Sequence, residues 1–213
     1  MVQTAYANGA STQYVERNLG LKVVCTPTGV KYLHHAAEKM DVGVYFEANG
    51  HGTIIFSEDT LETIARYAPR NPGQAEALET LRACVDLINQ AVGDALSDML
   101  LVEVVLAHKH WGPNEWLATY TDYPNRLLKV KVADRGMFTT TDAERKLVKP
   151  VGVQAQIDDV VKKVRQGRAF ARASGTEDAV RVYAEAATRA EADDLANKVA
   201  KIVEAAGATP VKV

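Results

Sequence analysis

Hydrophobic positions near the N-terminus come in short apolar runs separated by polar turns. Val2–Ala7 and Leu21–Cys25 are rich in apolar and β-branched residues, which is typical of buried strands. Between them, Thr12–Asn18 has room for about two helical turns before Gly20. The order strand, helix, strand predicts an α/β layer.

A second pair of apolar runs, Val42–Phe46 and Thr53–Phe56, flanks a polar segment, Glu47–Gly52. The Asn-Gly pair inside this segment is a strong signal for a tight turn between paired strands. The sequence therefore predicts a hairpin whose polar loop lies beside the α/β layer.

Helical spacing of apolar residues follows. It predicts helices over Glu58–Ala68, Ala75–Val92 and Ser97–His108, interrupted by Pro69 and Pro72. Helix-breaking residues then follow Trp111 and mark a change of pattern. We expect an α/β domain over residues 1–111 and a smaller domain over residues 112–213.

The second domain alternates between strand-like and helix-like patterns. The predicted elements are extended segments at Trp116–Thr121 and Leu127–Val132, a helix start capped by Thr141 and Glu144, helices at Val151–Gln166 and Arg189–Ala206, and strands at Arg168–Arg172 and Ala179–Ala186. A helix-covered antiparallel sheet accommodates these elements. The predicted fold class is α/β plus α+β, a mixed-sheet domain followed by an antiparallel-sheet domain.

Composition narrows the function without identifying it. The chain has 213 residues, 47% hydrophobic and 24% charged, with a formal net charge of −2. This charge disfavours nucleic-acid or anionic-membrane partners, which usually need a basic surface. Cys25 and Cys84 are isolated, and no segment resembles a signal peptide or a membrane span. We expect a cytoplasmic protein.

The loop between the last two strands carries the clearest chemistry. Ser174, Gly175 and Thr176 can turn backbone N–H groups and two hydroxyls toward one point, forming an anion-binding nest. Arg172 precedes the loop and Arg181 returns beside it, and guanidinium groups suit phosphate. The alternative is a polar hairpin whose hydroxyls satisfy their own turn and whose arginines are solvated.

Two loops of the first domain are candidate sugar contacts. Glu47 can accept hydroxyl protons, while Asn49 can both donate and accept. Gly50 belongs to the turn, and His51 either contacts a ligand or orders that turn. The alternative is a hairpin whose loop is simply solvated.

Thr28 and Gly29 follow the second strand, at the edge of the sheet where ligands collect in α/β folds. From the residues alone, a capped helix start is the favoured explanation, because such caps are common.

Several of these stretches resemble one enzyme family. Arg172–Glu177 (Arg-Ala-Ser-Gly-Thr-Glu) resembles the phosphate-binding signature of the α-D-phosphohexomutases, with Ala173 where the family usually has proline. The continuation Asp178–Ala186, the sugar loop Glu47–Thr53 and the stretch Thr28–His35 resemble the phosphoacetylglucosamine mutase branch. The resemblance covers nearly the whole chain.

The resemblance implies the third and fourth domains, the C-terminal half, of an isomerase that interconverts N-acetylglucosamine 6-phosphate and 1-phosphate for UDP-N-acetylglucosamine biosynthesis. Glu47 and Asn49 would contact the 3- and 4-hydroxyls of the sugar, and asparagine in place of the serine of glucose and mannose relatives favours the N-acetylated sugar. The residues Arg172, Ser174, Gly175, Thr176 and Arg181 would hold the phosphate that is not being transferred.

Two loops of the family are not found in this sequence. Neither a Thr-Ala-Ser-His-Asn-Pro-like loop for the phosphorylated serine nor an Asp-x-Asp-x-Asp-Arg loop for Mg²⁺ occurs. We therefore expect no catalytic residue and no cofactor in this chain, with Mg²⁺ held by N-terminal domains that would be its partners, and no turnover by the chain alone. The alternatives are half of a glucose- or mannose-phosphate mutase, or a non-catalytic phosphosugar-binding protein.

Overall fold

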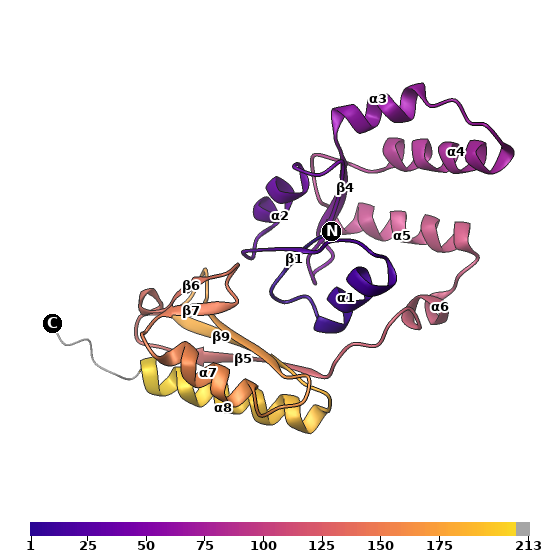
Figure 1. The fold of residues 1–213 in the computed structure, drawn as a ribbon. Coiled ribbons are helices and arrows are strands. Elements are labelled where there is room, and N and C mark those ends of the chain that lie inside the picture. Colours follow the sequence, from indigo (N-terminus) through magenta and orange to yellow (C-terminus); the bar gives the residue numbers. More distant parts are fainter. Residues whose placement is uncertain (208–213) are drawn as a thin grey trace. The chain divides into compact units, whose positions relative to one another are not determined.

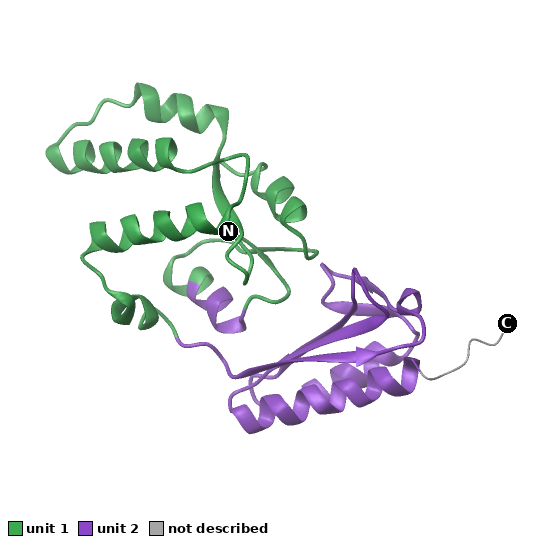
Figure 2. Ribbon diagram, turned by 180° about the vertical axis from the view of Figure 1, so that it is seen from behind, with its two compact units in different colours: residues 1–7, 15–120 green, residues 8–14, 121–213 purple. Residues whose placement is uncertain are grey.

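The computed structural model describes residues 1–207 (Figure 1). By its internal contacts the chain divides into two compact units (Figure 2). Unit 1 comprises residues 1–7 and 15–120, and unit 2 comprises residues 8–14 and the chain from residue 121 onward. Each unit has its own sheet and hydrophobic core, as the predicted fold class requires. The predicted domain boundary between residues 111 and 112 stays a prediction.

Unit 1 is built on a four-stranded sheet of order β2-β1-β3-β4. Its strands are β1 (Val2–Thr4), β2 (Val24–Thr26), β3 (Val42–Phe46) and β4 (Gly52–Phe56). β1 runs parallel to both β2 and β3, while β4 pairs antiparallel with β3. The four strands predicted along this part of the chain are present, and the first two are shorter than predicted. Helix α2 (Val30–Ala37) connects β2 to β3 and buries Leu33 and Ala37 against Val2 and Tyr45.

Three longer helices form a second core in unit 1. They are α3 (Glu58–Arg66), α4 (Pro72–Leu87) and α5 (Ala95–Lys109), and they bury Ile64, Leu78 and Leu101 with Phe56 of β4. The side chains of Ser57, Asn71 and Asp94 accept backbone N–H groups at the three helix starts. The predicted helix over 75–92 is shifted, because Asn71 caps it with Pro72 at its first position.

The predicted extended segment Trp116–Thr121 is wrong at its start. Residues Pro113–Leu117 form a short helix, α6. The N–H of Gly112 donates to the Glu115 carboxylate at 2.8 Å, and Pro113 stands at the first helical position. These local starting signals outweigh the strand preference of Trp116.

Unit 2 contains an antiparallel sheet of order β5-β9-β8, covered on one face by two helices. Its strands are β5 (Asn125–Lys131), β8 (Arg168–Ala173) and β9 (Ala179–Glu185), and its helices are α7 (Val153–Val161) and α8 (Arg189–Gly207). Figure 1 shows both helices along the same side of the strands. Ala171, Val180 and Val182 pack against Leu195 and Val199 of α8. The opposite face of the sheet carries the polar row described below.

The predicted capping box of Thr141 and Glu144 is also wrong. After the 3-10 turn η2 (Arg135–Met137), Thr139–Thr141 forms strand β6 and pairs with β7 (Lys146–Lys149). Asp142, Ala143 and Glu144 form the turn between them, with φ of 53°, 53° and 67°. Three successive left-handed residues cannot begin an α-helix.

Residues 8–14 belong to unit 2 through specific polar contacts. The chain enters α1 (Gly9–Gln13), followed by the π-helix η1 (Tyr14–Asn18), from Asn8, whose side chain bonds both the N–H and the C=O of Tyr123. The N–H of Gly9 donates to Glu185 at 3.1 Å. Glu185 is 2% exposed and also accepts two bonds of 2.9 Å from Arg168. A buried carboxylate needs such donors, so Glu185 holds α1 on the sheet.

None of the helices in residues 1–207 is long and apolar enough to cross a bilayer.

Candidate functional site

Three cations form one row across the sheet of unit 2. Arg172 of β8 lies directly opposite Arg181 of β9, and Arg181 lies directly opposite Lys129 of β5. Directly paired residues on antiparallel strands project from the same face, with Cβ atoms about 5 Å apart. The row therefore stands on the face opposite the helix-packed residues Val180 and Val182, beside the loop that joins β8 to β9.

Two carboxylates neutralise this row. Glu177, from the loop, accepts from Arg181 at 2.6 Å and from Lys129 at 3.2 Å. Glu144, from the left-handed turn, lies 3.3 Å from Arg172, whose side chain is 17% exposed. The hydrogen bond from Lys129 and the charges of Lys129 and Arg181 hold the pKa of Glu177 below its usual value. Both arginines are therefore paired with carboxylates and are not solvated alone.

The loop itself is ordered by its backbone. The N–H of buried Ser174 donates to Ala179 O at 2.8 Å, and the N–H of Thr176 reaches Ser174 Oγ at 3.4 Å. Gly175 is exposed, and a Cβ at Gly175 would meet nothing within 4 Å. From η2, Arg135 donates to the carbonyl oxygens of Ser174, at 3.2 Å, and of Glu177, at 3.5 Å. The loop carbonyls are thus drawn toward Arg135, while Gly175 leaves open space at its tip.

The predicted sugar loop of unit 1 is a closed turn. The Glu47 N–H bonds His51 O at 2.8 Å, and the Gly50 N–H bonds Glu47 O at 3.0 Å. Asn49 uses its side-chain oxygen to accept the His51 N–H at 3.0 Å, and Gly50 adopts φ +87°. The backbone of His51 orders the turn, and its side chain is exposed. Glu47 is half-buried at the end of β3.

A buried acid, Asp98 of α5, supports this turn from below. Its carboxylate accepts the Gly52 N–H at 3.1 Å and is 5% exposed. Burial raises the pKa of Asp98, with a further rise from Asp94, while the Gly52 bond and His51 oppose the rise. The sugar loop is therefore fixed at its base by one buried side chain.

Thr28 and Gly29 lie at the same sheet edge as the sugar loop. β1, β2 and β3 are parallel, so the loops that follow β2 and β3 meet at the carboxyl edge, with β1 between them. Strands are spaced by about 4.8 Å, which puts these two loops about 10 Å apart. Gly29 is the N-cap of α2 with φ 128° and makes no side-chain capping bond. The alternative that Thr28 and Gly29 only cap the start of α2 is therefore not supported by a side-chain capping bond.

Three polar residues of these sites, Lys129, Arg135 and Asp98, were not predicted from the sequence, and Glu177 was noted only as part of the signature. The alternation of Leu127–Val132 placed Lys129 on a solvated face, but only the pairing of β5 with β9 puts it beside Arg181. Arg135 and Asp98 act from 39 and 46 residues away. The place of Glu177 in the signature, four residues before Arg181, was the available signal for its contact with Arg181.

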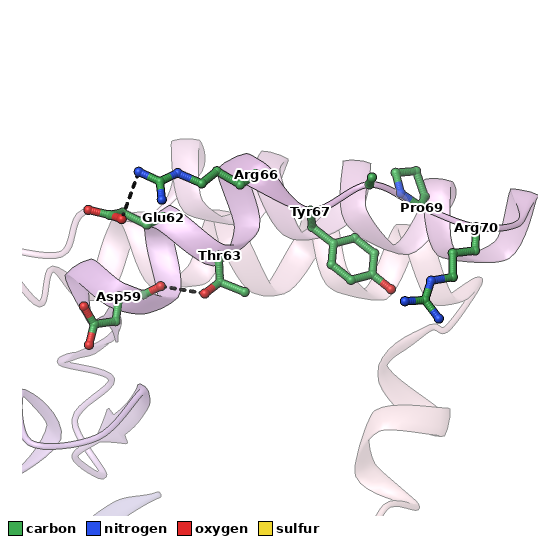
Figure 3. A pocket seen from close by; sticks show the side chains of 8 residues that line it. Asp59, Glu62, Thr63, Arg66, Tyr67, Pro69 and Arg70 are labelled. Atoms are coloured by element: carbon green, nitrogen blue, oxygen red, sulfur yellow. Dashed lines mark hydrogen bonds and ion pairs between the residues drawn. The ribbon is translucent and has the colours of Figure 1, made fainter.

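A surface pocket of about 800 Å³ lies elsewhere (Figure 3). It is lined by α3 and the loop that follows, from Asp59 to Arg70. Two of its polar groups are already paired, since Arg66 bridges Glu62 at 3.3 Å and Thr63 donates to Asp59 O at 2.8 Å. None of the predicted site residues lines it, so it is not the candidate site.

Comparison with known proteins identifies the family. The profile described as phosphoacetylglucosamine mutase AMG1, domain III, matches residues 1–111, and that of the phosphoglucomutase/phosphomannomutase C-terminal domain matches residues 127–202. The chain belongs to the phosphoacetylglucosamine mutase family. This confirms the resemblance seen in the loops.

Individual relatives agree with this assignment. Phosphoacetylglucosamine mutase 1 of Schizosaccharomyces pombe is 55% identical over 95% of this chain and 39% of its own length. The human phosphoacetylglucosamine mutase is 53% identical over 95% of this chain and 38% of its own length. The chain therefore spans about two fifths of the curated relatives that it matches.

Solved structures of the family have the same fold. The Aspergillus fumigatus N-acetylphosphoglucosamine mutase in complex with GlcNAc-6P and magnesium matches with a TM-score of 0.95 and 66% identity, over 97% of this chain and 38% of that chain. In residues 1–207, no cluster of three or more His, Cys, Asp or Glu side chains could hold a metal ion.

Proposed function

We propose that this chain is the substrate-recognition part of a phosphoacetylglucosamine mutase that interconverts N-acetylglucosamine 6-phosphate and 1-phosphate in the cytoplasm for UDP-N-acetylglucosamine synthesis. Its relatives carry that enzyme name, and one has been solved with GlcNAc-6P and magnesium. In the whole enzyme, Mg²⁺ and the phosphorylated serine would be held by other domains. The chain alone would bind substrate without turning it over.

One observation carries the proposal, the cation row beside the Ser174–Thr176 loop. Like charges on directly opposite strand positions repel, so such a row needs anions, which are the Glu177 and Glu144 carboxylates in the ligand-free chain. Arg172 and Arg181 bring two planar donor groups to the loop, and these groups suit the oxygens of a phosphate. The Gly175 tip lets a ligand approach the backbone closely.

The sugar would be held by unit 1. Glu47 can accept two hydroxyl hydrogens, and the amide group of Asn49 can donate while its oxygen holds the turn. Thr28 and Gly29 at the same sheet edge would bound the other side of the sugar. Unit 1 would recognise the hydroxyl groups of the sugar, and unit 2 would bind the phosphate that is not transferred. Holding the reactant in a fixed orientation is the contribution that such residues make to phosphoryl transfer.

Calorimetric titration of N-acetylglucosamine 6-phosphate into the chain tests this proposal. Arg172→Ala removes a charge-assisted contact of about 1.5–3 kcal/mol and should weaken binding by roughly ten- to hundredfold. Arg66→Ala is the matched control, because Arg66 is an exposed arginine of unit 1 that pairs with Glu62. Equal affinities for the two variants would contradict the phosphate site. A coupled mutase assay with turnover above background would contradict the expected inactivity.

The choice of sugar is tested with the same protein. Glucose 6-phosphate should bind more weakly than N-acetylglucosamine 6-phosphate, and inorganic phosphate more weakly than either. Asn49→Ser, which introduces the residue of the glucose and mannose relatives, should narrow the difference between the two sugars. A wild-type chain that binds both sugars equally would favour a glucose- or mannose-phosphate mutase.

A further inference from the structure

Glu177 is the carboxylate that Lys129 and Arg181 share. One carboxylate oxygen lies 2.6 Å from Arg181 and the other lies 3.2 Å from Lys129. Lys129 and Arg181 occupy directly opposite positions of β5 and β9, so their charges would repel without this anion. Glu177 thus holds two side chains of the row at one point beside the loop.

We propose that Lys129 is a third cation of the phosphate site and that Glu177 is an internal counter-anion that the phosphate replaces. This inference rests on the proposed function. It adds one binding residue and one competitor to the set of Arg172, Ser174, Gly175, Thr176 and Arg181.

The donor geometry supports the exchange. Since the two oxygens of one carboxylate reach both Arg181 and Lys129, two oxygens of one phosphate, which are separated only slightly more, can reach the same donors. Phosphate carries a larger charge than a carboxylate and offers a third oxygen for Arg172. One phosphate can therefore neutralise the row that now requires both Glu177 and Glu144.

The Glu177 carboxylate can be displaced from Lys129 and Arg181 at little cost. Its side chain is 39% exposed and belongs to the loop rather than to a strand. Exposed ion pairs are weak because water competes for both partners. Glu177 therefore orients Lys129 and Arg181 before binding and competes with the ligand during binding.

Inorganic phosphate and N-acetylglucosamine 6-phosphate are titrated into the wild type and two pairs of variants. Glu177→Gln should tighten the binding of both ligands about threefold or more, because the competitor is neutral while the side chain keeps its size. Asp178→Asn is its matched control, since it removes the same charge from the adjacent exposed residue, whose carboxylate makes no ion pair within residues 1–207. If Asp178→Asn tightened binding as much as Glu177→Gln, the change in net charge alone would explain the result, and the inference would be overturned.

Lys129→Met should weaken binding about tenfold, as expected for one lost charge-assisted contact. Lys162→Met is the control, an exposed lysine at the end of α7 that pairs with Asp159 and is located on an element that covers the other face of the sheet. Equal affinities of the Lys129→Met and Lys162→Met variants would overturn the assignment of Lys129 to the phosphate site.

A direct readout does not depend on how the variants fold. In the wild type, the carboxyl carbon signal of Glu177 in NMR should move as phosphate is added, while that of Asp178 stays in place. A Glu177 signal that stays fixed at saturation would contradict the exchange. Binding that is lost in Arg172→Ala but unchanged in the Glu177 and Lys129 variants would leave the proposed function standing and remove this inference. A wild type that binds neither ligand would remove both.

Discussion

The two candidate loops are both connections between neighbouring antiparallel strands, yet they are stabilised in different ways. The β3–β4 loop closes on itself, with backbone bonds between Glu47 and His51 and a buried acid, Asp98, at its base. The β8–β9 loop is held by long charged side chains that reach it from β5, η2 and β9. A loop of fixed backbone can present hydroxyl partners at set positions. A loop held by exposed ion pairs can exchange its carboxylate for another anion, such as a phosphate.

Gly52, the first residue of β4 after the sugar loop, and Gly175 of the β8–β9 loop differ most in the space around them, and this contrast gives the largest expected effect. In Gly52→Ala the new Cβ would overlap the carbonyl oxygen of Tyr45 and the ring of Phe46. We expect a loss of about 3 kcal/mol in the free energy of unfolding, as for overpacking against rigid backbone. In Gly175→Ala, where nothing lies within 4 Å, the loss should stay below about 0.5 kcal/mol. Urea unfolding of the two variants measures both, and equal losses would contradict the contrast between a closed and an open loop.

Arg135 gives the next largest effect, because it donates to two carbonyl oxygens of the β8–β9 loop. Arg135→Ala should cost about 1–2 kcal/mol and speed hydrogen exchange at the loop amides. Arg145→Ala is the control, since Arg145 bonds the nearby Asp142 within an exposed turn. If Arg145→Ala accelerated exchange at Ser174 as much as Arg135→Ala does, Arg135 would not be a specific support of the loop.

The sequence predicted the hairpins well because their determinants are local. The alternation of Val180, Val182 and Ala184 fixes which face of β9 is buried, and a short loop then forces Arg172 to lie opposite Arg181. The sites themselves stay predictions, but the proximity of these two arginines follows from strand pairing.

The missed features depend on long-range placement or on unusual backbone conformations. No local pattern indicates that β5 pairs with β9, so the position of Lys129 beside Arg181 required the structure. The left-handed turn Asp142–Glu144 contains no glycine, and its Thr-x-x-Glu spacing imitates a helix cap. In both places the tertiary pairing of strands decides what the local sequence leaves open.

The smallest expected effect is a pH dependence of opposite sign in the two loops. Burial raises the pKa of Asp98 above its unfolded value, so the folded state binds the proton more tightly. Its contribution to stability is therefore favourable at low pH and is lost as the pH rises through the folded pKa. The pKa of Glu177 is lowered instead, mainly by the hydrogen bond from Lys129. Its contribution is present above the unfolded pKa, about 4.3, and is lost as the pH falls through the folded pKa.

Unfolding of Asp98→Asn and Glu177→Gln from pH 3 to pH 7, followed by NMR signals within each unit, isolates these two contributions. Relative to Asp98→Asn, the wild type should become less stable as the pH rises. Relative to Glu177→Gln, it should become more stable, by a small amount because exposed ion pairs are screened by water and salt. The neutral amide that Asp98→Asn introduces can still accept the Gly52 N–H, so the first difference reports the buried charge and not a lost hydrogen bond. If the wild type became more stable with rising pH relative to both variants, the Asp98 carboxylate would be stabilised as the Glu177 carboxylate is. The β3–β4 loop would then depend on charge, as the β8–β9 loop does.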